Sequence, residues 1–285
     1  MRLAFSIACL VSLLAVASAG AVDAATKRVM LVRHGHTEMN AFIHRLNIVA
    51  RLTPGFEDPM MIDTRLTETG ERQAEGAGRT LQVAHDMLEP GGRVQLVVCS
   101  PLTRALKTAE LAFAHAGGNV PRIVHPLCAE RRWHGSDLGR ERPVLEREFP
   151  GCDFSLLPSR GSWGYARESE PETHPEGGPI PEESEPAFIA RMQAFHAWLD
   201  SRPEQRIAVV THWGVIYALS GVPVPNCDVL DCRFEELRPG DHFLEGEGGL
   251  DELRGLRPIT TGQHHDGAKG HMTSSSVLEI IIHMK

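Results

Sequence analysis

Short, unbroken apolar runs alternate with amphipathic stretches along most of this chain. Four runs cover residues 29–32, 96–98, 123–124 and 207–210, and a fifth covers residues 276–283. Continuous apolar runs of this length are typical of strands that are buried on both faces of a sheet. Such strands need helices above and below them, so the pattern predicts an α/β fold with a mostly parallel central sheet.

Two stretches between these runs have the periodicity of helices that face a core. Their apolar residues recur at spacings of three and four: Ala74, Ala77, Leu81, Ala84 and Leu88 in the first, and Phe188, Met192, Phe195 and Leu199 in the second. Each set forms one apolar stripe and is interpreted as a packing surface. Gly91-Gly92 and Pro203 are predicted to end the two helices.

Size and composition are those of an ordinary globular protein. The chain has 285 residues, of which 42% are hydrophobic and 23% are charged. These values suit a single α/β domain with a substantial core, which we place at residues 20–285. Residues 150–185 interrupt the strand–helix pattern with many Pro, Gly, Ser and Glu residues, and they are predicted to form an insertion or lid.

The N-terminus is predicted to be a signal peptide, residues 1–19. A short positive start is followed by an almost wholly apolar segment, residues 3–16, and the Ala-Ser-Ala sequence at 17–19 has the pattern of a cleavage site. The alternative is an uncleaved anchor, since residues 3–22 are just long enough to span a bilayer. Cleavage predicts a protein that is secreted or lumenal in the secretory pathway, with no membrane contact afterwards.

The cysteines do not form an obvious disulfide framework. Six are present, and removal of Cys9 with the signal peptide would leave five. Secretion permits disulfides, but an odd and scattered set does not predict a pairing. For Cys227 and Cys232, the closest pair, a disulfide and two buried free thiols both remain open.

The charge balance limits the classes of partner. The formal net charge is −8 and no basic stripe is visible, so we do not expect the protein to bind nucleic acid. An acidic protein can still bind an anionic substrate, because a pocket can be locally positive.

Basic residues follow three of the predicted strands at the point where each strand ends. Arg33 and His34 come directly after the first run, Arg104 follows the second, and His212 follows the fourth. Because the carboxyl ends of parallel strands meet at one edge of a sheet, these four side chains are expected to converge. Arginine binds phosphate oxygens in pairs through its planar fork, so the expected pocket suits a phosphate group.

The turn after the first strand adds to this interpretation. Gly35 allows a close backbone approach, and a helix is predicted to begin near Thr37 or Glu38, where a helix N-terminus favours an anion. His36 follows His34 by two residues, but no carboxylate or cysteine completes a metal-ligand set at suitable spacing. The sequence therefore predicts an anion site without a metal.

A histidine in such a pocket can act as a nucleophile toward phosphorus and form a phosphohistidine. Nearby cations lower the pKa of the imidazole and stabilise the transferring phosphoryl group. The leaving alkoxide needs a proton, and Glu130, just after the weak third strand, is the candidate general acid. Asp137 is the second candidate.

Together these segments resemble the histidine phosphatase superfamily, also called the phosphoglycerate-mutase-like family. The resemblance runs from Arg28 to at least Arg233, and it rests on an Arg-His-Gly-x-Thr motif at 33–37, a Ser-Pro-x-x-Arg-Ala motif at 100–105 and an Arg-Leu-Thr-Glu-Thr-Gly stretch at 65–70. It implies a three-layer α/β/α sandwich with a mostly parallel central sheet, and chemistry that needs no cofactor. It also implies roles for named residues: His34, Glu130 and His212 are catalytic, and Arg33, Asn40 and Arg104 bind phosphate.

Three features favour the phosphatase-like branch of that family. The Arg-Arg-Trp-His-Gly segment at 131–135 is only a loose match to the Glu-Arg-His-Tyr-Gly signature of glycolytic mutases, and Asp-Leu-Gly at 137–139 resembles the phosphatase-like branch. Asn226-Cys227 also resembles a strand signature of that branch, which favours a structural role for Cys227.

The expected function is hydrolysis of a small phosphorylated substrate. The alternatives are a phosphomutase, whose lid at 150–185 would have to exclude water, and a non-catalytic phospho-ligand-binding protein on the same fold. A metal-dependent hydrolase is the least favoured. Neither the identity of the substrate nor the oligomeric state can be predicted from the sequence.

Overall fold

The computed structural model describes residues 26–46, 56–87, 93–114, 120–159 and 182–244. Four predicted features lie outside these ranges: the signal peptide, the helix end at Gly91-Gly92, the C-terminal strand at 276–283, and residues 160–181 of the predicted insertion. Within the described residues, no helix has the length and apolar composition needed to cross a bilayer.

A five-stranded sheet with the order β3-β2-β4-β1-β5 forms the centre of the molecule. The strands are β1 (Arg28–Arg33), β2 (Leu96–Cys99), β3 (Arg122–Val124), β4 (Arg206–Thr211) and β5 (Val229–Arg233). The first four pair in parallel and β5 pairs antiparallel with β1. The strands predicted from the apolar runs at 29–32, 96–98, 123–124 and 207–210 are therefore confirmed.

Strand β5 was not among the predicted strands. It lies at the edge of the sheet, and residues such as Asp231 and Arg233 are exposed on it, so it lacks the continuous apolar run of a strand covered on both faces. Its position beside β1 brings Asn226 to Asp228, which precede it, next to the end of β1.

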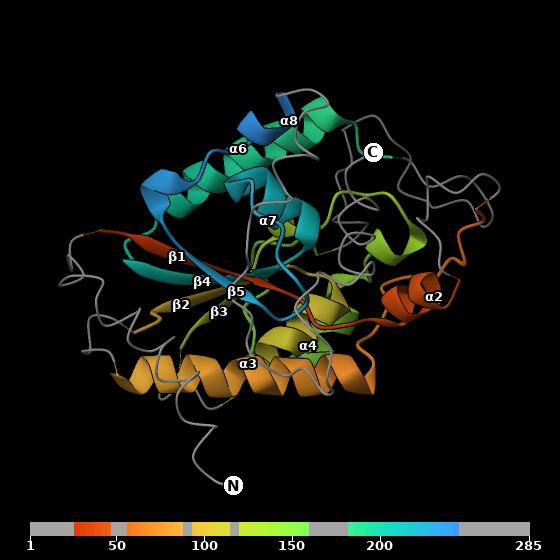
Figure 1. Cartoon of the computed structure of the whole chain (residues 1–285), viewed down its shortest axis with the longest axis horizontal. Coiled ribbons are helices and arrows are strands. Elements are labelled where there is room, and N and C mark those ends of the chain that lie inside the picture. Colours follow the sequence, from red (N-terminus) through yellow and green to blue (C-terminus); the bar gives the residue numbers. More distant parts are fainter. Residues whose placement is uncertain (1–25, 47–55, 88–92, 115–119, 160–181, 245–285) are drawn as a thin grey trace, which may run out of the picture.

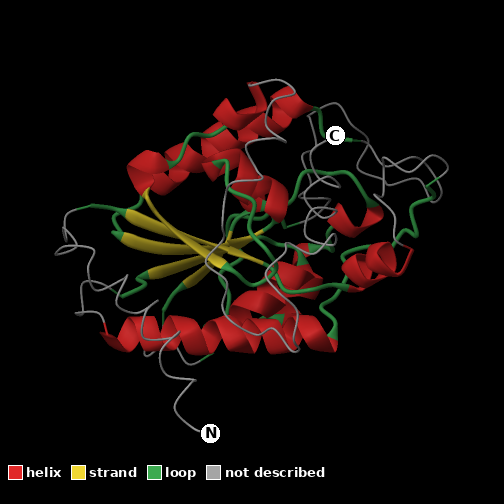
Figure 2. Cartoon of the chain, in the orientation of Figure 1, coloured by secondary structure: helices red, strands yellow, loops and turns green. Residues whose placement is uncertain are grey.

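Helices cover both faces of the sheet, as Figures 1 and 2 show. The long helix α3 (Glu68–Met87) and α4 (Thr103–Ala112) lie on one face, and α6 (Glu185–Ser201), α7 (Trp213–Ser220) and α8 (Asp241–Leu244) lie on the other. Helix α2 (Glu38–Leu46) lies beyond the end of β1, and α5 (Arg142–Glu148) follows β3 in the chain. The predicted three-layer α/β/α sandwich is confirmed.

Alternate residues of each strand pack into two separate cores. Ile207 and Val209 of β4 lie in the cluster that contains the α6 residues Phe188, Met192, Phe195 and Leu199. Ala208 and Val210 lie in the cluster that contains the apolar face of α4. The predicted stripe on α6 is therefore a core face, and α6 ends two residues before Pro203, as predicted.

All five cysteines in the described part of the chain are free thiols. The alternative of a disulfide between Cys227 and Cys232 is therefore wrong. Both side chains are buried, and burial raises the pKa of Cys227 to about 12 and that of Cys232 to about 11. Protonated, buried thiols of this kind are packing residues.

Candidate active site

A pocket opens at the carboxyl ends of the parallel strands, between α2, the loop that follows β3, and the start of α7. All four basic residues expected at this edge are buried there. The structure brings five of the six predicted site residues onto the wall of one pocket: Arg33, His34, Asn40, Arg104 and Glu130. The sixth, His212, lies behind the wall, with its ring centroid 5.1 Å from that of His34.

Hydrogen bonds from two neighbouring segments fix the backbone of His34. Its N–H donates to the carbonyl of Thr211 at the end of β4 (2.9 Å), and its carbonyl accepts from Nδ2 of Asn226, just before β5 (2.8 Å). A Cβ atom on Gly35 would lie 2.5 Å from the carbonyl oxygen of Gly70, so only glycine allows this approach of the two segments. The turn after β1 is thus held from both sides.

The tautomer of His34 follows from its own turn. Nδ1 lies 2.8 Å from the carbonyl oxygen of Gly35, and a carbonyl can only accept, so Nδ1 carries the hydrogen. In the neutral ring Nε2 then carries the lone pair. The side chain is 6% exposed and lines the pocket, which is the arrangement required of a nitrogen nucleophile.

His212 is held as a neutral imidazole. Its Nδ1 accepts from Nε of Arg104 (3.3 Å), and its Nε2 donates to Oγ of Ser100 (2.6 Å). Because an arginine can only donate, the hydrogen of His212 must be on Nε2. Burial, and then the charges of Arg104 and His34, hold the pKa of His212 well below its ordinary value.

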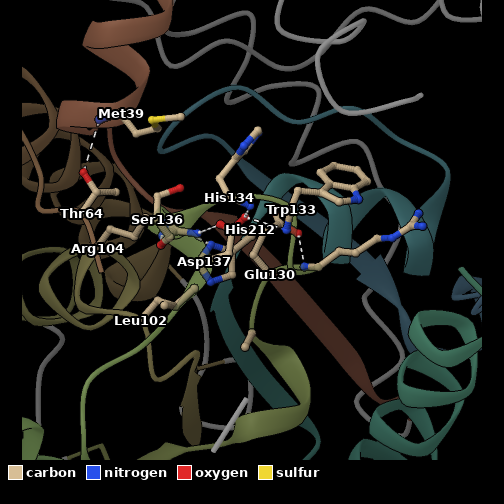
Figure 3. Close-up of polar contacts among 12 residues, drawn as sticks. Met39, Thr64, Leu102, Arg104, Glu130, Trp133, His134, Ser136, Asp137 and His212 are labelled. Atoms are coloured by element: carbon tan, nitrogen blue, oxygen red, sulfur yellow. Dashed lines mark hydrogen bonds and ion pairs between the residues drawn. The ribbon is translucent and has the colours of Figure 1, made fainter. Parts of the chain in front are cut away.

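Arg104 is the polar centre of this cluster. One terminal nitrogen donates to Oδ1 of Asp137 (2.9 Å) and the other donates to the carbonyl of Ser136, as the close-up in Figure 3 shows. Oδ2 of Asp137 accepts the N–H groups of Trp133 (3.1 Å) and His134 (3.0 Å). Asp137 therefore orients both Arg104 and the loop that covers it, and its two oxygens are already engaged.

Glu130 differs from Asp137 in its surroundings. It is 4% exposed, Oε1 accepts from the N–H of Arg131 (2.8 Å), and Oε2 accepts from the N–H of Gly214 in the first turn of α7 (3.2 Å). Burial, followed by the negative charge of Asp137, raises the pKa of Glu130 to about 7. A carboxyl group with that pKa can both donate and accept a proton at neutral pH.

Thr37 and Asn40 close the site at the start of α2. The N–H of Thr37 donates to Oδ1 of Asn40 (3.1 Å), and the N–H of Asn40 donates to Oγ1 of Thr37 (3.1 Å). This reciprocal pair caps the helix, which begins at Glu38 as predicted. The cap uses the amide oxygen of Asn40, so the donor that Asn40 has for a phosphate is its amide nitrogen.

Arg191 of α6 is a buried residue of the site region that the sequence analysis missed. Its guanidinium donates to the carbonyls of Leu127 (2.7 Å) and Ala129 (2.8 Å), and more weakly to that of Glu130 (3.4 Å). It also forms a buried ion pair with Glu183, at 2.7 Å. A charged residue inside the apolar stripe of a predicted helix was the available signal, because such a residue needs a buried partner.

Other pocket residues were missed because an isolated position, in a loop or in the first turn of a helix, carries no sequence pattern. Four of them line the pocket wall: Met39, Thr64, Trp133 and His134. His36, for which the sequence predicted no metal-ligand set, has its Nδ1 3.0 Å from Oγ1 of Thr67 and helps to join the turn to the start of α3. In the part of the chain that the structure describes, no three His, Cys, Asp or Glu side chains are grouped as metal ligands.

Comparison with known proteins assigns this site to a family. The sequence model of the histidine phosphatase superfamily (branch 1) matches residues 29–222, a span that includes all six predicted site residues. The chain belongs to the histidine phosphatase superfamily. The resemblance to this superfamily that the sequence motifs indicated is therefore confirmed.

Individual relatives within the superfamily have low sequence identity to this chain. A probable phosphatase of Schizosaccharomyces pombe is 26% identical over 227 residues, 74% of this chain and 90% of that protein. A phosphoglycerate mutase-like protein of Arabidopsis thaliana is 26% identical over 184 residues, 55% of this chain and 62% of that protein. Among solved structures, the ecdysone phosphate phosphatase of Bombix mori is 16% identical, with a TM-score of 0.48 and coverage of 86% of this chain and 97% of that one.

The raised pKa of Glu130 predicts how stability changes with pH. In an unfolded chain the group titrates near 4.5 and in the folded protein near 7, so the folded protein holds the extra proton between these values. The free energy of unfolding therefore falls as the pH rises through this range. Relative to Glu130→Gln, which is neutral at every pH, the wild type should lose roughly 3 kcal/mol between about pH 4.5 and about pH 8.

Urea unfolding of both proteins across this pH range is the measurement. The sign of the change is the test, because an ordinary surface glutamate would give a difference that hardly changes with pH. A difference that grows in favour of the wild type as the pH rises would contradict a buried carboxyl group with a raised pKa.

Proposed function

We propose that this protein is a phosphomonoester hydrolase that works through a phosphohistidine on His34. Membership of the histidine phosphatase superfamily supports phosphatase activity. The observation that carries the residue assignment is the hydrogen bond from His34 Nδ1 to the carbonyl of Gly35, which leaves the lone pair on Nε2. That nitrogen belongs to a ring on the wall of a pocket that also contains Arg33 and Arg104.

In the first step, His34 Nε2 attacks phosphorus and the bond from phosphorus to the ester oxygen breaks. Arg33, Arg104 and the amide nitrogen of Asn40 bind the phosphoryl oxygens, whose charge is spread in the transition state. The departing alkoxide takes the proton of Glu130, and the pKa of about 7 supports this role because a large fraction of the carboxyl group is protonated at neutral pH.

In the second step, water attacks the phosphohistidine and the phosphorus–nitrogen bond breaks. The Glu130 carboxylate left by the first step takes a proton from the water, so the same residue serves as acid and then as base. Inorganic phosphate leaves, and both His34 and Glu130 return to their starting states. His212, neutral and tied to Arg104 and Ser100, is proposed to position Arg104 beside the phosphoryl group.

Asp137 is the less favourable general acid on this geometry. Its carboxylate is the ion-pair partner of Arg104 and accepts two backbone N–H groups. A proton on Asp137 would weaken all three interactions. We therefore assign it a positioning role.

Phosphate release tests the proposal directly. Across a panel of phosphomonoesters, wild-type protein should release phosphate in the presence of a chelator, because the proposed chemistry needs no metal. His34→Ala should lower the rate by a factor on the order of 1,000 or more, because the nucleophile is removed. The measurement is a colorimetric phosphate assay with His196→Ala as the control, since His196 stacks on Phe234 and lies away from the pocket.

Three outcomes would count against this proposal. Release that persists in His34→Ala would exclude His34 as the nucleophile, and release that a chelator stops would indicate a metal-dependent reaction. Transfer of the phosphoryl group between hydroxyl groups without phosphate release would favour the phosphomutase alternative.

The dependence of the rate on the leaving group tests Glu130 and its support. Para-nitrophenolate is a stable anion that leaves without a proton, whereas an alkoxide needs one. Glu130→Gln should therefore slow the hydrolysis of alkyl phosphates about 100-fold more than that of para-nitrophenyl phosphate. Arg191→Lys keeps the charge but not the fork that binds three carbonyls around Glu130, so it should show the same selectivity at about 10-fold.

The matched control is Arg233→Lys, which alters an exposed arginine paired with Glu236. It should not affect either class of substrate. If Arg191→Lys slowed alkyl and aryl esters equally, its role would be in general folding and not in the position of Glu130.

A further inference from the structure

His134 is a buried, well-oriented residue of the pocket that has no role in the proposed chemistry. Its side chain lines the pocket and is 7% exposed. Its Nδ1 lies 3.4 Å from Oδ2 of Asp58, and the edge of the Phe56 ring packs against it, with 5.8 Å between ring centroids. The ring is therefore held in one orientation by residues from a distant part of the chain.

Asp58 is itself fixed as a carboxylate. Oδ1 accepts from the N–H of Met60 (2.7 Å) and Oδ2 accepts from the N–H of Gly135 (2.9 Å). Burial opposes the charge, but the hydrogen bonds from His134 and Gly135 outweigh it and lower the pKa of Asp58 below its ordinary value. A Cβ on Gly135 would lie 2.9 Å from Cα of Met60, so this close contact between the two loops depends on glycine.

The partner of Nδ1 decides which nitrogen of His134 can serve a ligand. A carboxylate only accepts, so Nδ1 carries the hydrogen and, in the neutral ring, Nε2 is an acceptor. Because Nδ1 faces Asp58, Nε2 is the ring nitrogen that is left to face a ligand in the pocket. Figure 3 shows the ring projecting away from the ion pair of Arg104 and Asp137, between Met39 and Trp133 in that view.

The wall around His134 differs from the phosphate end of the pocket. Among the described lining residues, both arginines, Arg33 and Arg104, lie beside the two histidines. The two carboxyl groups of the wall, Glu130 and Asp137, belong to the same end, since Asp137 is paired with Arg104 and Glu130 is the proposed acid. The remaining lining residues around His134 include apolar or uncharged side chains: Met39, Ile43, Trp133, Trp213, Thr64 and Ser136. A ligand that reaches from the first region into the second would carry one phosphate on a neutral group with an apolar face.

We propose that His134, oriented by Asp58, is a specificity-determining residue that accepts a hydrogen bond from a hydroxyl group on the alcohol part of the substrate. The substrate class is then a monophosphate ester of a neutral, hydroxyl-bearing compound. This inference takes the position of the phosphate from the proposed function, but it does not require that the protein hydrolyses the ester. Without the acceptor on His134, the buried hydroxyl of the ligand is left unpaired, so this ligand binds more weakly. The analogue that lacks the hydroxyl should bind as before.

Binding to a protein that cannot turn over the ligand gives the test. We would measure dissociation constants by calorimetry for alkyl phosphates of two to about six carbons and for the matching esters with a terminal hydroxyl, using full-length His34→Ala. At one chain length the hydroxyl-bearing ester should bind about 10-fold more tightly than its partner. His134→Phe in this background keeps the ring but removes Nε2, and the preference should vanish while the affinity for the plain ester is unchanged.

Two further variants separate recognition from a structural effect. His134→Gln keeps an acceptor near the position of Nε2 and should retain part of the preference, whereas His196→Phe, a substitution away from the pocket, should retain all of it. A preference that survives His134→Phe, the absence of any preference or binding in His34→Ala, or a preference for esters ending in a carboxylate would each overturn the inference. Failure of the proposed function has a different signature, in which these esters bind with the expected preference but wild-type protein releases no phosphate.

Discussion

The parallel register between β1 and β4 is the constraint on which the site depends. Arg33, the last residue of β1, pairs with Thr211, the last residue of β4, so His34 and His212 leave the sheet side by side. The hydrogen bond from the N–H of His34 to the carbonyl of Thr211 continues the ladder into the site. A slip of one residue would turn every β4 side chain to the opposite face, and both faces are filled, so the two cores hold the histidines in place.

Burial then sets the charge of each group in the pocket. A low-polarity environment makes an unpaired charge costly, and the structure meets that cost by pairing Arg104 with Asp137 and Arg191 with Glu183. It also keeps His212 neutral and raises the pKa of Glu130 to about 7. Two carboxyl groups of one loop thus differ in role, because Asp137 forms an ion pair with Arg104 whereas burial dominates at Glu130 and raises its pKa.

Much of this arrangement could be predicted because it follows from backbone geometry. Apolar runs mark strands, and parallel strands bring their carboxyl ends to one edge, so Arg33, His34, Arg104 and His212 could be placed together before any coordinates were known. Edge strand β5 could not be predicted, because exposure on one side removes the continuous apolar run. Its antiparallel direction depends on pairing with β1, which is a tertiary contact.

The roles of the loop residues in the pocket also could not be predicted from the sequence, because they depend on tertiary contacts. The roles of His134 and Asp58 depend on a contact between segments that are 76 residues apart, and no local spacing encodes it. Arg191 is an intermediate case, because its place within an apolar helix stripe indicated a buried partner without identifying Glu183. Short motifs therefore predict the fold and the phosphate end of the site, but they do not predict the part of the pocket that would select a substrate.

The central claim is that His34 carries the phosphoryl group, and trapping that intermediate tests it most directly. Wild-type protein would be mixed with a radiolabelled phosphomonoester, denatured within the first turnover and digested, and the labelled peptide would be identified by mass spectrometry. The account predicts label on the peptide that contains His34, lost in acid and stable in base, as a phosphorus–nitrogen bond requires, and no label in His34→Ala. Label on a serine, threonine, cysteine or aspartate, or on a different histidine, would contradict it.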